Sequence, residues 1–225
     1  MNNDDCAVIT LNYESQAVIH LMKKDPILSK VIKLVGPIEY KLYNSDKYVF
    51  LVDTIIGQML SNKVADIICN RLHNLCNNTV TPEKLSRLSF EQFRSTGLSR
   101  SKIEYIGNLT NAILSGSLNL DGIDSLVDEE IIESLTKVRG IGLWSAKMFL
   151  IFVLNRPNIL PLEDTAFLQS FCWAYEIENP KKSLIKEISE IWKPYSSIAS
   201  RYLYKALDLR YTKTPFREYK QCSGI

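Results

Sequence analysis

The sequence predicts an all-α fold built as two helical lobes. Apolar residues recur at helical spacing along nearly the whole chain, and this pattern accounts for ten or eleven helices. Only residues 7–12 have a composition that fits a short strand or an extended lead-in. With 225 residues, of which 46% are hydrophobic and 23% charged, the chain can bury a sizeable core.

Most of these helices have a recognisable start or stop. Pro26 falls in the first turn of the helix expected at residues 25–35, and Thr81 precedes Pro82 as an N-cap followed by proline in the first turn. Gly97 follows a short helix and ends it. The predicted helices span residues 15–23, 25–35, 46–59, 62–76, 90–95, 102–114, 128–135, 143–155, 165–175, 182–192 and 196–210.

Composition excludes several classes of protein. The five cysteines are odd in number and form no CxxC pair, so neither a disulfide framework nor a zinc site is expected. No apolar run approaches the roughly 18 residues of a membrane span. The polar start MNNDDC does not resemble a signal peptide. We therefore expect an intracellular protein without a membrane partner.

Charge is unevenly distributed, although the net charge is only +2. Residues 181–220 contain ten Lys and Arg against four Asp and Glu, whereas residues 121–135 contain six acids and no base. A basic C-terminal segment favours phosphate binding. Two solvated helix faces of opposite sign explain the same pattern, so composition alone leaves both readings open.

A tight turn between two helices is the most informative segment. Residues 135–149 read LTKVRGIGLWSAKMF, with Gly140 and Gly142 immediately before a helix. Glycines permit unusual torsions and a close approach of the backbone, and the unpaired amides of a helix start bind phosphate. Gly-x-Gly also occurs in purely structural turns, so the motif alone does not decide between the two.

Five segments together resemble the helix-hairpin-helix DNA glycosylases, specifically their alkylpurine (3-methyladenine II) branch, over residues 20–210 in the right order. They read LVDTIIGQMLSNKVADIICNRL, GLSRSKIEYIGNLTNAILSG, LTKVRGIGLWSAKMFLIF, RPNILPLEDTAFLQSF and WKPYSSIASRYLYKAL. The resemblance implies two helical lobes with a helix-hairpin-helix motif and the active-site cleft between them. We place one lobe at about residues 40–130, and the hairpin and catalytic lobe at 1–39 plus 131–225.

The resemblance implies that Asp164 is the catalytic residue. Breaking an N-glycosidic bond places positive charge on the sugar, which a nearby carboxylate stabilises. Asp164 also suits an N-cap, and one residue can fill both roles because a helix start favours the ionised form. Glu163 is the competing carboxylate.

Trp144 stands where bifunctional relatives carry a lysine that attacks the sugar and nicks the strand. An indole cannot act as an amine nucleophile, and Lys147 is nearly one helical turn away and expected at the surface. We therefore expect a monofunctional enzyme without lyase activity.

The resemblance also implies a base pocket formed by Trp144, Tyr204 and Met148, and a DNA wedge formed by Met59 with Gln58. Aromatic faces bind cationic alkylated bases and stack on extruded ones. Both aromatics could instead be core residues. Met59 could unstack DNA, or it could simply fill a gap in the core.

The expected contacts to the DNA backbone come from Gly140, Gly142, Arg139 and Ser145, and Ser196 stands where relatives often carry an arginine. By position, the carbonyls of Thr136, Val138 and Ile141 would hold the structural sodium or potassium ion that the family is said to bind. The sequence contains no C-x₆-C-x₂-C-x₅-C pattern near its end, so no iron–sulfur cluster is expected. No other cofactor is expected.

The expected function is excision of alkylated purines such as 3-methyladenine from double-stranded DNA in base excision repair, by a monomer that flips the damaged base. Its compartment would be the cytoplasm or nucleoid of a prokaryote, or a eukaryotic nucleus. Alternatives are a glycosylase for uracil, hypoxanthine or an oxidised purine, a non-catalytic DNA-binding module that keeps the hairpin, and a helical protein–protein scaffold.

Overall fold

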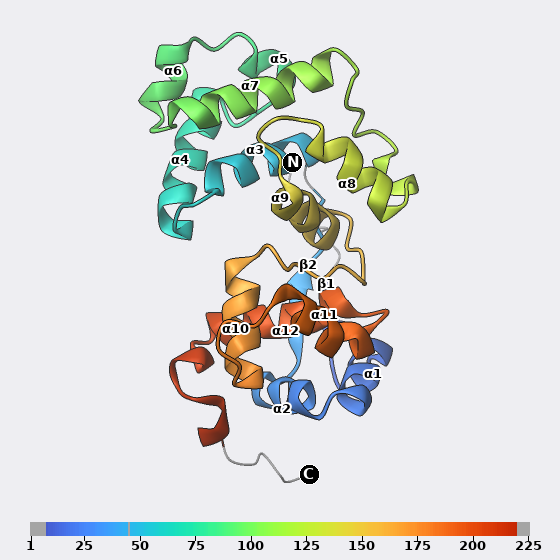
Figure 1. Cartoon of the computed structure of the whole chain (residues 1–225). Helices are drawn as coiled ribbons and strands as arrows, with labels where there is room; N and C mark the ends of the chain where they lie inside the picture. Colours follow the sequence, from blue (N-terminus) through green and yellow to red (C-terminus); the bar gives the residue numbers. More distant parts are fainter. Residues whose placement is uncertain (1–7, 45, 220–225) are drawn as a thin grey trace. The chain divides into compact units, whose positions relative to one another are not determined.

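The computed structural model describes residues 8–44 and 46–219, and these residues are predominantly helical, as the sequence predicts. Their contacts form two compact units, drawn in Figure 1. We call them the terminal unit, Met1–Tyr43 with Asn155–Ile225, and the central unit, Asn44–Leu154. The central unit is one continuous segment, whereas the terminal unit combines an early and a late part of the chain. Within residues 8–44 and 46–219, every helix is too short or too polar to cross a membrane.

Helices α2, α10 and α12 form the centre of the terminal unit, where α10 packs against α12 and both contact α2. Their buried side chains surround Phe167, Phe171 and Trp192. The elements of the unit are β1 (Val8–Leu11), α1 (Gln16–Lys24), α2 (Pro26–Val35), β2 (Ile38–Lys41), α10 (Thr165–Tyr175), α11 (Lys182–Ser189), η3 (Glu190–Trp192), α12 (Ser196–Asp208), η4 (Tyr211–Lys213) and η5 (Phe216–Glu218).

A buried carboxylate ties these helices together. Asp25 is the N-cap of α2, and its Oδ1 accepts hydrogen bonds from the amides of Ile27 and Leu28, each at 2.9 Å. Its Oδ2 accepts from the Tyr175 hydroxyl and from the indole N–H of Trp192, the latter at 2.8 Å. The N-cap of α2 is therefore also the link between α2, α10 and η3.

The terminal unit contains a two-stranded antiparallel sheet of which the sequence predicted only one strand. β1 lies within the expected residues 7–12 and pairs with β2, with Val8 opposite Lys41 and Leu11 opposite Ile38. β2 has four residues, and Ile38 is its only buried side chain. Such a short strand lacks the alternating apolar pattern by which strands are recognised in a sequence.

In the central unit, the apolar helix α3 packs against α4, α7 and α9. Its buried residues are Tyr48, Leu51, Val52, Ile55 and Ile56. The elements are α3 (Lys47–Gly57), α4 (Asn62–Leu75), α5 (Pro82–Leu85), α6 (Phe90–Ser95), α7 (Arg100–Leu114), η1 (Ile123–Ser125), α8 (Asp128–Thr136), α9 (Leu143–Met148) and the π-helical turn η2 (Phe149–Val153).

The contacts place the hairpin in a different unit from the one we expected. Residues 131–154 were assigned with residues 1–39 and the catalytic aspartate, but they belong to the central unit. The reason is packing, because α9 contacts α8 and α3, and η2 contacts α3. The unit boundaries therefore fall at residues 43–44 and 154–155, where the sequence shows no linker.

Candidate active site and DNA-binding elements

The hairpin between α8 and α9 requires a glycine at position 140. The amide of Ile141 donates to the carbonyl of Val138 at 3.0 Å, which closes a turn, and Gly140 is the third residue of that turn, with φ of +110°. A Cβ at this position would lie 2.4 Å from both Cβ and Cγ of Tyr105 on α7. Torsion and space therefore both exclude a side chain.

Gly142 has a different reason to be a glycine. Its backbone is extended, with φ of −94°, and its carbonyl accepts the Ala146 amide at 3.1 Å to start α9. A Cβ at this position would meet nothing within 4 Å. The residue is exposed, so the missing side chain leaves the start of α9 open to a neighbouring molecule.

The charged side chains around the hairpin already have acidic partners. Arg139 bonds Glu104 at 2.7 Å and Lys137 bonds Glu133 at 2.9 Å, with all four side chains well exposed. Exposed pairs of this kind contribute little stability, so exchanging a carboxylate for a phosphate costs little. Arg139 therefore remains available for the contact with the DNA backbone that the sequence predicts.

Ser145, which we expect to contact the DNA backbone, has a buried side chain. The residue is 1% exposed, and its Oγ accepts a hydrogen bond from Gln58 Nε2 at 3.3 Å. Its hydroxyl is therefore occupied inside the central unit. Only its main-chain amide, in the first turn of α9, remains a group that could face phosphate.

The turn between α3 and α4 presents Met59 to solvent. Met59 has φ of +59°, and its side chain is fully exposed. Exposure contradicts the alternative reading of Met59 as a core residue. A left-handed torsion is costly for a residue with a side chain and persists only where neighbours fix it. Here Gln58 fixes it, because its Nε2 also donates to the Gly140 carbonyl at 2.9 Å.

Asp164 is the N-cap of α10 in the terminal unit. Its Oδ1 accepts the Phe167 amide at 2.8 Å, and the residue is only 9% exposed. The neighbouring carboxylate of Glu163 instead lies 3.4 Å from Lys182 Nζ. The structure thus gives the cap position to Asp164 and a surface ion pair to Glu163.

Tyr204 lies beside Asp164. Burial raises the pKa of the Tyr204 hydroxyl, and the charge and hydrogen-bonding of Asp164 raise it further. The hydroxyl is therefore protonated at neutral pH and can donate to the carboxylate. Tyr204 is partly buried on α12, so it acts on Asp164 as well as being a candidate aromatic surface.

Arg201 was not predicted as a site residue, and it lies one helical turn before Tyr204 on α12. Its guanidinium lies 3.8 Å from the centre of the Tyr40 ring, and its Nη2 donates to Asn155 Oδ1 at 3.4 Å. Burial lowers the pKa of Arg201, and its charge lowers that of Tyr204. The three-residue spacing from Tyr204 was the available signal.

Comparison with known proteins identifies the family. A family model described as "HhH-GPD superfamily base excision DNA repair protein" matches residues 52–194. The chain belongs to the HhH-GPD superfamily. Its hairpin, the turn that carries Met59, and Asp164 all fall within the matched region.

Relatives and solved structures agree with that membership. DNA-3-methyladenine glycosylase 1 of Schizosaccharomyces pombe is 33% identical over 215 residues, covering 92% of this chain and 93% of the relative. A DNA-3-methyladenine glycosidase structure from Bacillus halodurans has a TM-score of 0.82 at 30% identity, covering 93% and 97%. The S. pombe enzyme Mag1 in complex with abasic DNA has a TM-score of 0.81 at 31% identity, covering 86% and 97%. The predicted fold class and family are confirmed.

The predicted site residues of this HhH-GPD protein divide between the two units. Asp164 and Tyr204 belong to the terminal unit. Trp144 on α9 is partly buried in the central unit, and Met148, one turn further on, is 7% exposed and contributes to packing. The central unit also holds the residues predicted as the wedge, Gln58 and Met59, those predicted to contact DNA, Arg139, Gly140, Gly142 and Ser145, and the candidate cation ligands Thr136, Val138 and Ile141.

The hairpin carbonyls fit the monovalent cation that the family resemblance implies. Thr136 ends α8, and the Val138 carbonyl accepts the Ile141 amide with one of its two lone pairs. Neutral main-chain oxygens are suitable ligands for alkali cations. Among the described residues, no group of three or more His, Cys, Asp or Glu side chains could hold a metal ion. Cys6 and Cys222 lie outside those residues.

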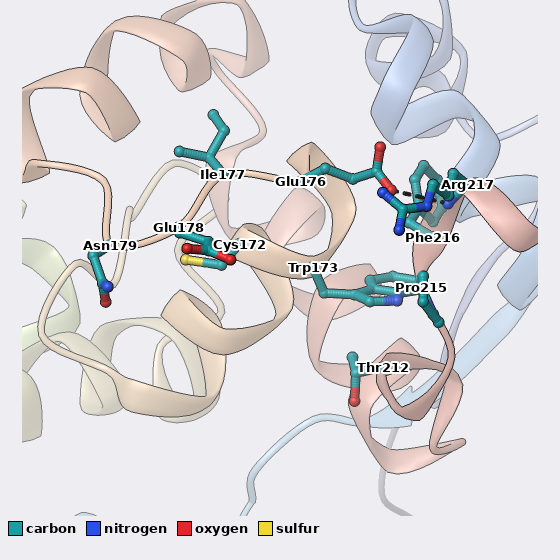
Figure 2. Close-up of a pocket in the computed structure, with 10 residues that line it drawn as sticks. All are labelled: Cys172, Trp173, Glu176, Ile177, Glu178, Asn179, Thr212, Pro215, Phe216 and Arg217. Atoms are coloured by element: carbon teal, nitrogen blue, oxygen red, sulfur yellow. Dashed lines mark hydrogen bonds between the residues drawn. The ribbon is translucent and has the colours of Figure 1, made fainter.

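A hollow of about 500 Å³ lies at the end of α10, shown in Figure 2, and it is separate from the predicted site residues. Trp173 lines it, with its indole N–H donating to the Thr214 carbonyl at 2.8 Å and Phe216 edge-on to its ring. Glu176 accepts the main-chain amide of Arg217 at 3.2 Å. These bonds hold the segment around η5 against α10, which is a structural role.

Proposed function

We propose that this protein is a monofunctional DNA glycosylase that excises alkylated purines such as 3-methyladenine from double-stranded DNA and so begins base excision repair. The observation that carries the proposal is a buried carboxylate at the start of α10, in a chain that aligns along nearly its whole length with 3-methyladenine glycosylases. The DNA complex of the similar Mag1 structure supports DNA as the partner.

The chemistry assigned to Asp164 follows from its place. An alkylated purine carries positive charge and leaves readily, and the sugar becomes positively charged as the bond breaks. Asp164 Oδ1 is held by the Phe167 amide, so the carboxylate is fixed before the reaction and stabilises the developing charge without reorganising. The same carboxylate orients the water that attacks the sugar carbon. The purine leaves with the electron pair of the broken bond.

Trp144 has two consequences for the reaction. The electron-rich face of an indole binds a cationic alkylated base more strongly than a neutral one. The same residue replaces the amine that a lyase would need for a covalent intermediate with the sugar. We therefore assign base selection to Trp144 and expect the product to be an abasic site in an intact strand.

The central unit supplies the contacts to duplex DNA. We assign backbone binding to the start of α9 with Gly140, Gly142 and Arg139, and unstacking to Met59. We also propose that the carbonyls of Thr136, Val138 and Ile141 hold a sodium or potassium ion that stiffens the hairpin. The protein would act as a monomer inside the cell, in the cytoplasm or nucleoid of a prokaryote or in a eukaryotic nucleus.

The test is release of free bases from methylated duplex DNA by wild type, Asp164→Asn and the matched control Glu163→Gln. Wild type and Glu163→Gln should release 3-methyladenine, whereas Asp164→Asn should release none and still bind DNA with the same salt dependence. The DNA strand should break only after alkali treatment, and borohydride should trap no covalent adduct.

Two results would overturn parts of this proposal. Equal release by Asp164→Asn would remove Asp164 from the chemistry. No release by wild type, with DNA binding intact, would reject alkylated purines, and uracil, hypoxanthine and oxidised-purine duplexes would then separate a different lesion from a binding module without catalysis.

A further inference from the structure

One face of α7 contacts both DNA-binding elements of the central unit. Lys102, Tyr105 and Asn108 are spaced three residues apart, so they lie along the same side of the helix. Tyr105 packs against Gly140 of the hairpin, and Asn108 Nδ2 donates to the Arg139 carbonyl at 3.1 Å. At the other end of this face, Lys102 reaches the turn that carries Met59.

Lys102 binds the end of α3 at two points. Its Nζ donates to the Ile56 carbonyl at 2.6 Å and to the Gln58 carbonyl at 2.8 Å. Carbonyls at a helix end have no partner within the helix and carry the negative end of its dipole, so an ammonium group binds them well. Burial lowers the pKa of Lys102, so this group is partly removed from water. The two bonds fix the main chain on both sides of Gly57.

Gln58 completes a closed circuit of contacts. Its side chain donates to the Gly140 carbonyl and to Ser145 Oγ, while its own carbonyl accepts from Lys102. Gln58 therefore links the α3–α4 turn to the hairpin, Tyr105 and Asn108 link the hairpin to α7, and Lys102 links α7 back to the turn. All the bonds are made within the central unit. Met59 is the residue that this circuit leaves outside, in a left-handed conformation and fully exposed.

We propose that Lys102 is a positioning residue for base flipping. Through the circuit of contacts between the turn, the hairpin and α7, which we call the α7 brace, it holds Met59 in its outward, left-handed conformation and at a fixed distance from the hairpin. Once the hairpin has bound a DNA phosphate, Met59 lies against the stacked bases and its turn needs no further change of conformation. The inference rests on the proposed function, because it assigns a role in unstacking duplex DNA.

Such a role differs from general support of the fold. Loss of the ammonium group would free the 57–60 turn to relax from the strained conformation at Met59 while the hairpin still binds phosphate. Affinity for undamaged DNA should therefore persist, and the unstacking step should fail. A purely structural lysine would instead change thermal stability and affinity together.

The experiment uses the full chain and duplex DNA with 2-aminopurine beside a 3-methyladenine analogue, since 2-aminopurine fluorescence rises when its neighbour is unstacked. Lys102→Met should lower the fluorescence rise and the single-turnover excision rate about tenfold or more, with DNA affinity within about threefold of wild type. Lys102→Arg should recover part of the loss. Lys30→Met, which removes an exposed charge from α2, is the matched control and should behave as wild type.

A double-mutant cycle tests whether Lys102 acts through Met59. Met59→Ala should cost most of the fluorescence rise, and adding Lys102→Met should then change little. Independent, multiplicative losses would overturn the proposal, as would unchanged unstacking in Lys102→Met. If Lys102→Met does not fold, Gln58→Met cuts the same circuit at the hairpin side, and it must show the same loss of unstacking for the proposal to stand.

The outcomes also separate this inference from the proposed function. Wild type that unstacks DNA in a Lys102-dependent manner but releases no base would support the brace and reject excision. If the Met59→Ala and Lys102→Met variants release base as well as wild type does, excision is supported and the brace is rejected. Wild type that neither unstacks nor excises would reject both.

Discussion

Tyr105 fills the space that any side chain at position 140 would need, since a Cβ there would lie 2.4 Å from its Cβ and Cγ. Gly140→Ala should therefore lower the free energy of unfolding by about 1–3 kcal/mol, through the clash and the positive φ together. Urea denaturation measures the change.

Gly142→Ala is the matched control for Gly140→Ala. Its φ of −94° suits alanine and a Cβ would meet no atom, so stability should hold. DNA affinity should nevertheless fall, because the methyl group would stand at the open start of α9. Equal destabilisation by the two substitutions would contradict the separate roles given to these glycines.

Asp25→Ala should be among the most damaging single changes. It leaves the buried indole N–H of Trp192, the Tyr175 hydroxyl and two main-chain amides without their acceptor. We expect a loss of about 3 kcal/mol or more in unfolding free energy. Asp46→Ala, which removes an exposed cap on the Tyr48 amide, should cost only about 1 kcal/mol. Similar losses in thermal or urea unfolding would argue against a central role for Asp25.

The two roles of Asp164 can be separated by choosing the replacement. Asparagine caps a helix as well as aspartate, so Asp164→Asn should keep stability within about 1 kcal/mol while abolishing excision. Asp164→Ala should lose both activity and roughly another 1 kcal/mol. Parallel melting curves and base-release assays make the comparison, and an inactive asparagine variant that is also strongly destabilised would favour a structural role alone.

Alkaline pH should destabilise the terminal unit. Burial raises the pKa of Tyr202 from 10.0 to about 12, and its hydroxyl donates to the Leu11 carbonyl at 3.4 Å. A raised folded-state pKa means that the stabilisation is complete below pH 10 and is lost as pH rises toward 12. Tyr202→Phe should flatten that fall in unfolding free energy. If the unfolding free energy of the variant falls as steeply with pH as that of wild type, the fall comes from other groups, such as Tyr204 and Tyr175, whose pKa values are also raised.

The sequence predicted local structure well where the chain carries its own signals. The helices at Phe90–Ser95 and Thr165–Tyr175 have the predicted bounds, since Ser89 and Asp164 cap their first turns. β2 was missed because four residues with one buried side chain give no periodic signal. Local patterns thus sufficed for these two helices and failed for β2, whose partner β1 is distant in the sequence.

Tertiary contacts account for the remaining differences in the candidate site. The sequence marked Gly140 through the Gly-x-Gly turn before a helix, whereas Asp164 and Met59 were marked by their places in segments that resemble the family. It did not mark Lys102, because a lysine that binds carbonyls of another helix follows no fixed spacing. For Arg201 the sequence offered only the three-residue spacing from Tyr204, since its contact with the Tyr40 ring is distant along the chain. The assignment of the hairpin to a lobe failed for the same reason.

The way the two units divide the chain also orders events during synthesis. The central unit is one stretch, so all its partners have been made once residue 154 has left the ribosome. The bond between Asp25 and Trp192 spans 167 residues, and it cannot form until the late part of the chain emerges. The apolar faces of the first helices that pack against α10 and α12 therefore stay uncovered while the central unit is already able to fold. Newly made chains are consequently most exposed to aggregation and to chaperones through α1 and α2.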